Sequence, residues 1–437
     1  MPTDNAMGDG KLKYRQRRRR RQTTMYLGIA LVLFCFFFAF HPSTASTRSS
    51  LFGPPGPAPR PELTPELLNN LSLGEAECNA AFPGLTKEVD DMVAKGPFIV
   101  KPTGDRGPLQ GRIKDNQLSI IHAQRRSDLS QEMLNSRTAS LHQLHRALLT
   151  SPTPLPPTIF TLNFLDQPFG TALSYSRAAD PSLAPRDPNA RSLLIPHFSF
   201  WSWPLPIVGS IARASAAITA LESALPFQHK TPKAVWRGTT WYNSAHSPGL
   251  RPALVRAAKG KPWADVEGLH GNMSNGMMIE EFCRYKYIVH TEGVAYSGRF
   301  QFHQLCGSVV LAPPVMWMQH VTHLVRPVWS GELLRGAGWR GTKVTERMRG
   351  VWEGVRASEA NVVFVERDWS DLGEVVGWLE AHPEVAEGIA RRQRETCYWR
   401  AAVRGWASMA RTEGQGWEEK EGMPFEAFAL SLEMGRG

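Results

Sequence analysis

The residues best suited to chemistry lie in a run of small side chains that ends in an arginine. Gly293, Ala295, Ser297 and Gly298 would let a ligand approach the backbone closely, and Arg299 follows at the expected start of a helix. The free N–H groups of a helix N-terminus favour an anion, whereas a cation there opposes the helix dipole. The unfavourable position of this arginine therefore predicts an anionic ligand at the loop.

A second candidate is the sequence Val-Trp-Arg-Gly-Thr-Thr at residues 235–240. A strand that ends in Arg237 and Gly238 would place a cation and hydroxyl donors where the backbone turns. That combination suits a diphosphate, which binds to charge and fixed donors together. The same pair at a strand end is also typical of a turn with a solvated arginine, so both interpretations stay open on these residues alone.

The elements that would position these segments are short buried strands that alternate with helices. Strands are expected at residues 159–164, 234–236, 308–311 and 361–365 and at the end of 280–289, and helices at residues 207–225, 301–306, 370–379, 383–391 and 397–410. This alternation predicts an α/β fold with parallel sheets of βαβ units. A division near residue 230 indicates two Rossmann-like halves.

Residues 285–311, with Trp-Arg-Gly at 236–238 before them, resemble the CAP10 family, which is glycosyltransferase family 90. That family includes fungal capsule-type xylosyltransferases and animal protein O-glucosyltransferases. Its pattern of Lys-Tyr-Lys-Tyr, an acidic residue with Gly, Ser-x-Arg-Phe and Cys-Gly-Ser-Val-Val is followed here in order. Further matches continue to residues 386–390, and the resemblance covers about residues 157–410.

The resemblance implies a GT-B fold, with two Rossmann-like domains facing a cleft, and inverting transfer from a UDP-sugar without a required metal. Asp166, in Asn-x-x-Asp-x-Pro at residues 163–168, matches the family's general base. Inverting transfer needs a carboxylate to take the proton of the attacking hydroxyl, and cations and N–H groups to hold the departing diphosphate. Taken alone, Asp-x-Pro is more typical of a turn at a strand end, and only the resemblance favours the catalytic interpretation.

The resemblance also implies a set of donor-binding residues. They are Arg237, Thr239, Arg251, Val294, Ala295, Tyr296, Ser297, Gly298 and Arg299. Within this set Tyr296 stands where the family has a small residue, and Gly298 where it has a large one. These departures leave UDP-xylose and UDP-glucose both open as donors, with a glycan or glycoprotein as acceptor.

The cysteines fit an oxidising compartment. Cys35 lies in an apolar segment, which leaves an even number, Cys78, Cys283, Cys306 and Cys397, with three possible pairings. The resemblance implies the pairs Cys283–Cys306 and Cys78–Cys397. The sequence has no Cys-x-x-Cys pattern, so we expect no metal site.

The N-terminus predicts a membrane anchor. Eight basic and two acidic residues in 1–22 precede a run without charge at 25–40. Residues 23–40 would form a type II signal anchor, which the positive-inside rule orients with the catalytic part in the lumen. Cleavage near residues 43–46 is the alternative. The Golgi membrane is the expected location, and the endoplasmic reticulum the second choice.

This placement sets the expected organisation. It comprises a cytoplasmic tail (1–22), the anchor (23–40), a stem (41–97), an N-terminal acceptor-side domain (98–230), a C-terminal UDP-sugar-binding domain (231–395) and C-terminal helices (396–437) packing back on the N-terminal domain. In the lumen, Asn70 and Asn272 would be N-glycosylation acceptors, because each begins an Asn-x-Ser sequon.

Composition and charge narrow the function classes. Of 437 residues 42% are hydrophobic and 21% charged, which excludes a disordered chain. Residues 1–22 carry six of the ten net positive charges, so the rest is too weakly basic for us to expect nucleic-acid binding. The alternative to an enzyme is an inactive family member that acts as a lumenal glycan-binding or scaffold protein. The presence of Asp166, Arg237 and Arg299 argues against it.

Overall fold

The computed structural model describes residues 70, 72–103, 108–180, 190–244, 247–334, 347–392, 410–412, 423–425 and 428. The chain divides into two units, residues 1–59 and 60–437, and all described residues belong to the second. No helix in the described part combines the length and apolar character needed to cross a bilayer. The predicted anchor at residues 23–40 lies outside the described residues.

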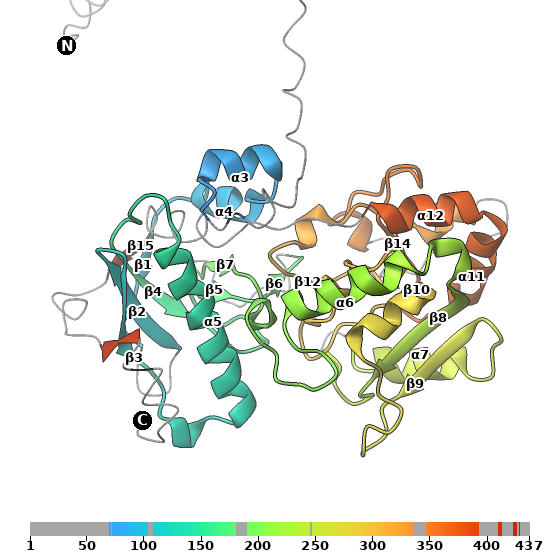
Figure 1. The fold of residues 1–437 in the computed structure, drawn as a ribbon, viewed down its shortest axis with the longest axis horizontal. Coiled ribbons are helices and arrows are strands. Elements are labelled where there is room, and N and C mark those ends of the chain that lie inside the picture. The colour runs from blue at the N-terminus through green and yellow to red at the C-terminus, as the bar shows by residue number, and fades with distance from the viewer. Residues whose placement is uncertain are drawn as a thin grey trace, which may run out of the picture. The chain divides into compact units, whose positions relative to one another are not determined.

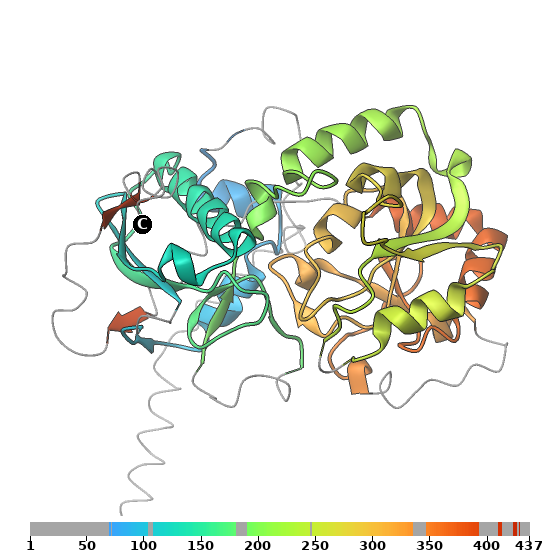
Figure 2. The ribbon, with the colours of Figure 1, turned by 90° about the horizontal axis from the view of Figure 1, so that it is seen from below.

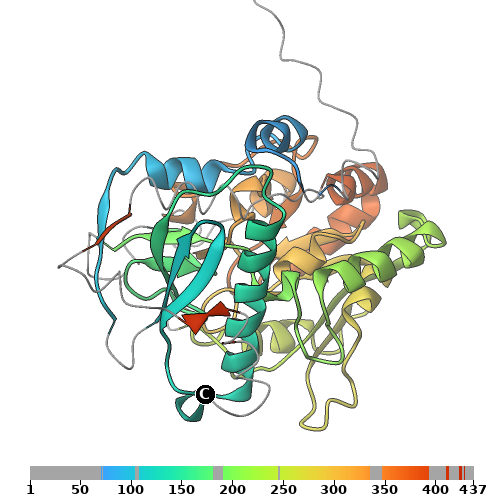
Figure 3. The same ribbon diagram turned by 60° about the vertical axis from the view of Figure 1, so that its left-hand side comes forward.

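The first large sheet has the strand order β16-β3-β2-β4-β5-β7 and mixes antiparallel and parallel pairs. Its strands are β2 (Leu109–Lys114), β3 (Gln117–His122), β4 (Thr158–Leu162), β5 (Ala172–Ser174), β7 (Ser192–Leu194) and β16 (Met423–Pro424). Asp115 and Asn116, both with positive φ, form the two-residue turn between β2 and β3, and such a turn suits a twisted hairpin. Helix α5 (Gln131–Leu149) runs along this sheet (Figure 3).

The second large sheet is parallel throughout, with the order β13-β14-β11-β10-β8-β9 (Figure 1). Its strands are β8 (Thr231–Gly238), β9 (Ala264–Gly268), β10 (Tyr285–Val289), β11 (Val309–Ala312), β13 (Pro327–Trp329) and β14 (Val362–Phe364). The central strands are buried on both faces, as their continuous apolar runs predict.

Helices cover both faces of the second sheet (Figure 2). Alternate strand residues face the two helix layers, because they belong to different apolar clusters. Trp236 and Tyr287 belong to one apolar cluster, together with residues of α7 (Leu250–Ala258), α11 (Leu372–Ala381) and α12 (Pro383–Arg391). Val235 and Ile288 belong to another, together with residues of α6 (Ile211–Ser223) and the helical turn η5 (Ile279–Arg284). The sheet is therefore the middle layer of three.

The sequence located the core strands but misjudged one sheet. The predicted strands at 159–164, 234–236, 308–311 and 361–365 correspond to β4, β8, β11 and β14. The expectation of parallel pairing is confirmed for the second sheet and wrong for the pairs β2–β3, β2–β4 and β3–β16 of the first. Only two residues join β2 to β3, and a parallel pair needs a crossover of roughly a dozen residues or more.

The first and last described segments differ from the predicted stem and the predicted C-terminal helix. Residues 72–97, assigned to the stem, include α3 (Glu75–Ala81) and α4 (Lys87–Val93), and Phe82 and Leu85 between these helices pack on Val321. Most of the helix predicted at 397–410 lies outside the described residues, but Ala410 begins a strand, β15 (Ala410–Thr412). That strand pairs with β1 (Phe98–Val100), and β16 pairs with β3.

Candidate functional site

The loop at residues 290–299 begins where β10 ends, at the carboxyl edge of the parallel sheet. Ligands of open α/β sheets bind at this edge. The N–H of Gly293 donates to the carbonyl oxygens of Ala295 and Tyr296, both at 3.1 Å, so the loop is a tight turn. The helix after it, α8 (Phe300–His303), has a single turn, shorter than the predicted 301–306. Its dipole is correspondingly weak, so positive charge here comes mainly from side chains.

Arg299 supplies the first of these charges. Its guanidinium donates to the carbonyl oxygen of Arg237 at the end of β8. A Cβ atom at Gly238 would lie 3.1 Å from Nη2 of Arg299, so the glycine makes room for this approach. Burial lowers the pKa of Arg299 to about 10, so the side chain stays protonated at neutral pH.

Arg251, at the start of α7, supplies the second charge and is almost fully buried. Its guanidinium donates to the carbonyl oxygen of Thr239 at 2.9 Å and to that of Glu292 at 3.0 Å. Burial and then the nearby charge of Arg299 lower the pKa of Arg251 to about 9. No carboxylate among the described residues forms an ion pair with Arg251 or Arg299. Two adjacent cations that contact only carbonyl and hydroxyl oxygens favour an anion.

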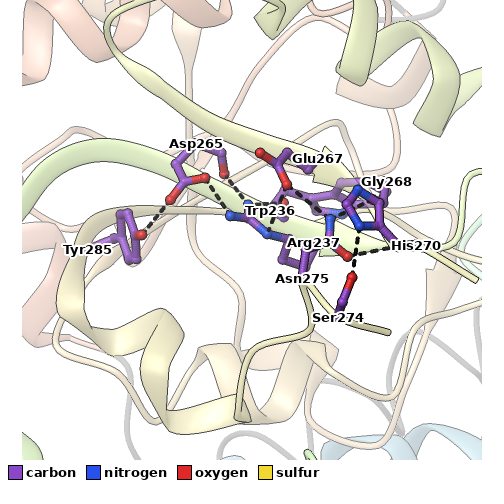
Figure 4. Close-up of polar contacts among 9 residues, drawn as sticks. All are labelled: Trp236, Arg237, Asp265, Glu267, Gly268, His270, Ser274, Asn275 and Tyr285. Carbon is purple, nitrogen blue, oxygen red and sulfur yellow. Dashed lines mark hydrogen bonds and ion pairs between the residues drawn. The ribbon is translucent and has the colours of Figure 1, made fainter. Parts of the chain in front are cut away.

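Arg237 has different partners (Figure 4). Its guanidinium forms an ion pair with Asp265 of β9 at 2.6 Å, and Asp265 also accepts a hydrogen bond from the hydroxyl of Tyr285. Although burial opposes it, these hydrogen bonds lower the pKa of Asp265. The network connects β9, β8 and β10. The predicted donor-binding side chain is thus neutralised by Asp265, and only its carbonyl oxygen contacts Arg299.

Asp166 lies in the loop after β4, and its backbone is fixed by neighbours. Buried Asn163 donates to the carbonyl oxygen of Gln167 at 2.7 Å and accepts from the N–H of Leu165 at 3.1 Å. Ser176 donates to the carbonyl oxygen of Asp166 at 2.8 Å. The carboxylate is accessible to solvent, yet the protein around it and then the charge of Glu132 raise its pKa. A raised pKa makes a carboxylate a better proton acceptor.

Tyr296 lies in the loop of Arg299 and packs against aromatic rings near Asp166. Its buried ring packs on Tyr175, with centroids 6.4 Å apart, and on His197 at 5.6 Å. Burial and then the charge of Asp166 raise the pKa of Tyr296. Ser176, which holds the Asp166 backbone, follows Tyr175 in the sequence, so the predicted base and the predicted donor loop are close together.

The departure from the family pattern at Gly298 has a physical cause. A Cβ atom at Gly298 would lie 2.7 Å from Cε1 of His197 and 3.1 Å from Cζ3 of Trp203. The volume that a large residue would fill is thus filled by these two rings from another segment. Nearby, Gln301 donates to the hydroxyl of Ser199 at 2.6 Å, which fixes α8 to the same segment.

The remaining predicted donor residues are placed as follows. Ala295 and Ser297 are buried, whereas Val294 is exposed. The hydroxyl of Thr239 accepts a hydrogen bond from Arg251 at 3.3 Å. The structure therefore brings Thr239, Arg251 and Arg299 together with the loop at residues 293–298.

Comparison with known proteins supports the resemblance inferred from the motifs. The family model described as Glycosyl transferase family 90 matches residues 116–330. This part of the chain is similar to that family. Protein O-glucosyltransferase 1 of Rattus norvegicus is 23% identical over 237 residues, which are 47% of this chain and 51% of the relative.

The human protein of the same name is 22% identical over 239 residues, with the same two shares. The O-glucosyltransferase rumi homolog of Anopheles gambiae is 22% identical over 211 residues, which are 44% of this chain and 46% of the relative. The chain spans about half the length of the curated relatives it matches.

Glu292 is a residue of this site that sequence reasoning did not assign a role. Its carboxylate accepts from the N–H groups of Met316 and Trp317, both at 2.8 Å, and lies 3.8 Å from Arg367. Burial raises its pKa to about 7, although Arg367 and the two N–H groups act in the opposite direction. It fixes the start of the donor loop to β12 (Trp317–Met318). The acidic position of the family motif was the available signal.

The predicted disulfide between Cys283 and Cys306 is confirmed, and it joins η5 to the segment after α8. Cys397 lies outside the described residues, so its pairing with Cys78 stays a prediction. Asn70 and Asn272 are both exposed, and their glycosylation stays a prediction. The described residues include no group of three His, Cys, Asp or Glu side chains arranged to hold a metal ion.

Proposed function

We propose that the chain is an inverting glycosyltransferase that moves xylose or glucose from a UDP-sugar to a hydroxyl of a glycan or glycoprotein. One observation carries the proposal. Arg251 and Arg299 are adjacent cations that donate to carbonyl oxygens and have no described carboxylate partner. Tyr296, in the loop beside them, packs on Tyr175, next to the serine that donates to the carbonyl oxygen of Asp166. An anion site and a proton acceptor are thus close together. The match to family 90 supports sugar transfer as the chemistry.

In the proposed reaction Asp166 takes the proton of the acceptor hydroxyl while its oxygen attacks the anomeric carbon. The bond between that carbon and the diphosphate oxygen breaks, and its electron pair leaves with UDP. Arg251 and Arg299 stabilise the charge that develops on the diphosphate. We further propose that no metal is required, because two guanidinium groups can supply the positive charge.

The fold supports a GT-B assignment, with an acceptor-side domain at 98–230 and a UDP-sugar domain at 231–395. The parallel sheet from β8 to β14 lies wholly in the second range, and the donor loop follows its central strand β10. This position is typical of nucleotide sites in α/β sheets.

We also propose a type II Golgi membrane protein, anchored by residues 23–40. The support is the uncharged run at 25–40 behind eight basic residues. Protease treatment of intact microsomes tests this orientation. A lumenal catalytic part would be protected until detergent is added, and degradation without detergent would contradict the proposal.

The enzymatic proposal is tested on the purified full-length protein with UDP, UDP-xylose and UDP-glucose, with and without EDTA. We expect UDP to raise the melting temperature and one UDP-sugar to be hydrolysed slowly, both in the presence of EDTA. Asp166→Asn should keep the UDP-induced shift and lose turnover, whereas Arg299→Met should lose the shift. A folded protein that no uridine nucleotide stabilises would refute the proposal and favour a non-catalytic binding protein.

A further inference from the structure

Tyr296 has a buried hydroxyl that forms no hydrogen bond with any of the described residues. The side chain is 5% exposed, and no hydrogen bond involves its Oη atom within the described residues. Most buried polar groups in proteins are hydrogen-bonded, so an exception needs a physical explanation. An unsatisfied hydroxyl lowers the stability of the free protein, and a ligand atom that accepts from it removes that cost.

The neighbouring Tyr175 shows that this environment can satisfy a phenol. Tyr175 is also buried, and its hydroxyl lies 2.5 Å from Oγ of Ser140 and donates to the carbonyl oxygen of Ser136 at 3.2 Å. The two rings are in contact, with centroids 6.4 Å apart. One phenol of the pair is thus bonded within the protein, and the other is not.

The position of Tyr296 indicates which ligand would reach it. A UDP-sugar whose diphosphate lies at Arg251 and Arg299, and whose anomeric carbon is attacked by a hydroxyl held at Asp166, must place its sugar between these groups. Tyr296 belongs to the same loop as Arg299, and its ring packs on Tyr175, whose neighbour in sequence, Ser176, donates to the carbonyl oxygen of Asp166. Its flanking residues in the loop, Ala295 and Ser297, are small, so Tyr296 is the bulky side chain among residues 295–297.

We propose that Tyr296 selects the donor sugar: its hydroxyl donates a hydrogen bond to an oxygen of the transferred sugar, and its ring limits the sugar to a pentose. The inference rests on the proposed function and deepens it, because it favours xylose over glucose. Glucose carries an additional hydroxymethyl group, which competes with the ring of Tyr296 for space. Burial keeps the phenol protonated at neutral pH, so it acts as a donor.

The first test compares Tyr296→Phe with the matched variant Tyr175→Phe in the full-length protein. Without ligand, Tyr296→Phe should melt at the wild-type temperature or above, whereas Tyr175→Phe, which loses a bonded hydroxyl, should melt lower. UDP should stabilise both variants. The additional stabilisation by UDP-xylose over UDP should be lost in Tyr296→Phe and kept in Tyr175→Phe.

The second test uses Tyr296→Ala, which opens space beside the sugar. The ratio of kcat/KM for UDP-glucose to kcat/KM for UDP-xylose, measured by donor hydrolysis, should rise at least tenfold, because a carbon-sized group in a pocket discriminates by about 10–200-fold. Three results would overturn this inference without contradicting the proposed UDP site. They are an unchanged kcat/KM ratio in Tyr296→Ala, a wild-type preference for UDP-glucose, and, in Tyr296→Phe, the same additional stabilisation by UDP-xylose over UDP as in the wild type. A wild-type protein that UDP does not stabilise would instead refute the proposed function.

Discussion

The close approach of His197 to the donor loop makes Gly298 a sensitive position. In Gly298→Ala the new methyl group would meet Cε1 of His197 at 2.7 Å and Nε2 at 2.8 Å. His197 cannot move aside easily, because Nδ1 lies 2.8 Å from Oγ of Ser199 and its carbonyl oxygen accepts from Gln143 at 3.0 Å. Overpacking of this kind costs about 1–3 kcal/mol. We therefore expect Gly298→Ala to lower the free energy of unfolding by about 2 kcal/mol.

The control for this change is Gly377→Ala, in the interior of α11. A Cβ atom there meets nothing within 4 Å, so the substitution adds helix propensity and should stabilise by about 0.5–1 kcal/mol. Urea denaturation followed by tryptophan fluorescence measures both effects. In the double variant Gly298→Ala with His197→Ala the steric contribution should vanish, which a double-mutant cycle isolates.

A Gly298→Ala variant as stable as Gly377→Ala would refute the steric reasoning. So would a cycle in which removal of the His197 ring leaves the cost of the added methyl group unchanged. Either result would mean that the loop relaxes around the new methyl group, and that a larger residue at this position is excluded for another reason.

Three further predictions follow from other contacts. The pKa of Glu292 in the folded protein, about 7, exceeds its value in the unfolded chain, so the folded state binds the proton more tightly. The free energy of unfolding should therefore fall by about 3 kcal/mol as the pH rises from about 4.5 to 7. In Glu292→Gln, urea denaturation should show a smaller pH dependence over this range. Asp265→Asn should cost roughly 2 kcal/mol in the same assay because it removes the ionic partner of Arg237, yet UDP should still raise its melting temperature. Loss in Cys283→Ser of the disulfide, whose cysteines are 23 residues apart in sequence, should lower stability by about 3 kcal/mol, and a reducing agent should lower the melting temperature of the wild type by more than that of this variant.

The sequence predicted those parts of the fold whose pattern is local. The β-branched runs that became β11 and β14, and the helix of α12 with proline at its first position, follow from periodicity and capping alone. The hairpin of β2 and β3 was missed because Asp115-Asn116 is a weaker turn signal than a pair that contains glycine.

For the candidate site too, the sequence predicted some features, and others depend on contacts between distant segments. Motif position correctly associated Arg299 with Arg251, because both belong to segments that end or follow strands of one sheet. It could not show that Asp265 neutralises Arg237, since that contact depends on the register of β8 against β9. Nor could it show that His197 and Trp203 fill the space beside Gly298, because such packing depends on contacts between distant segments.

The strands at the end of the described chain bear on how the protein is made. β15 and β16 occupy sheet positions beside β1 and β3, which were synthesised far earlier. During translation these early strands leave the ribosome with an edge exposed, and unpaired strand edges promote aggregation. The parallel sheet, whose strands all lie between residues 231 and 364, needs no later strand. A chain truncated after residue 395 would therefore have every strand of the second sheet and lack one strand of the first, so truncation near the C-terminus destabilises the N-terminal sheet.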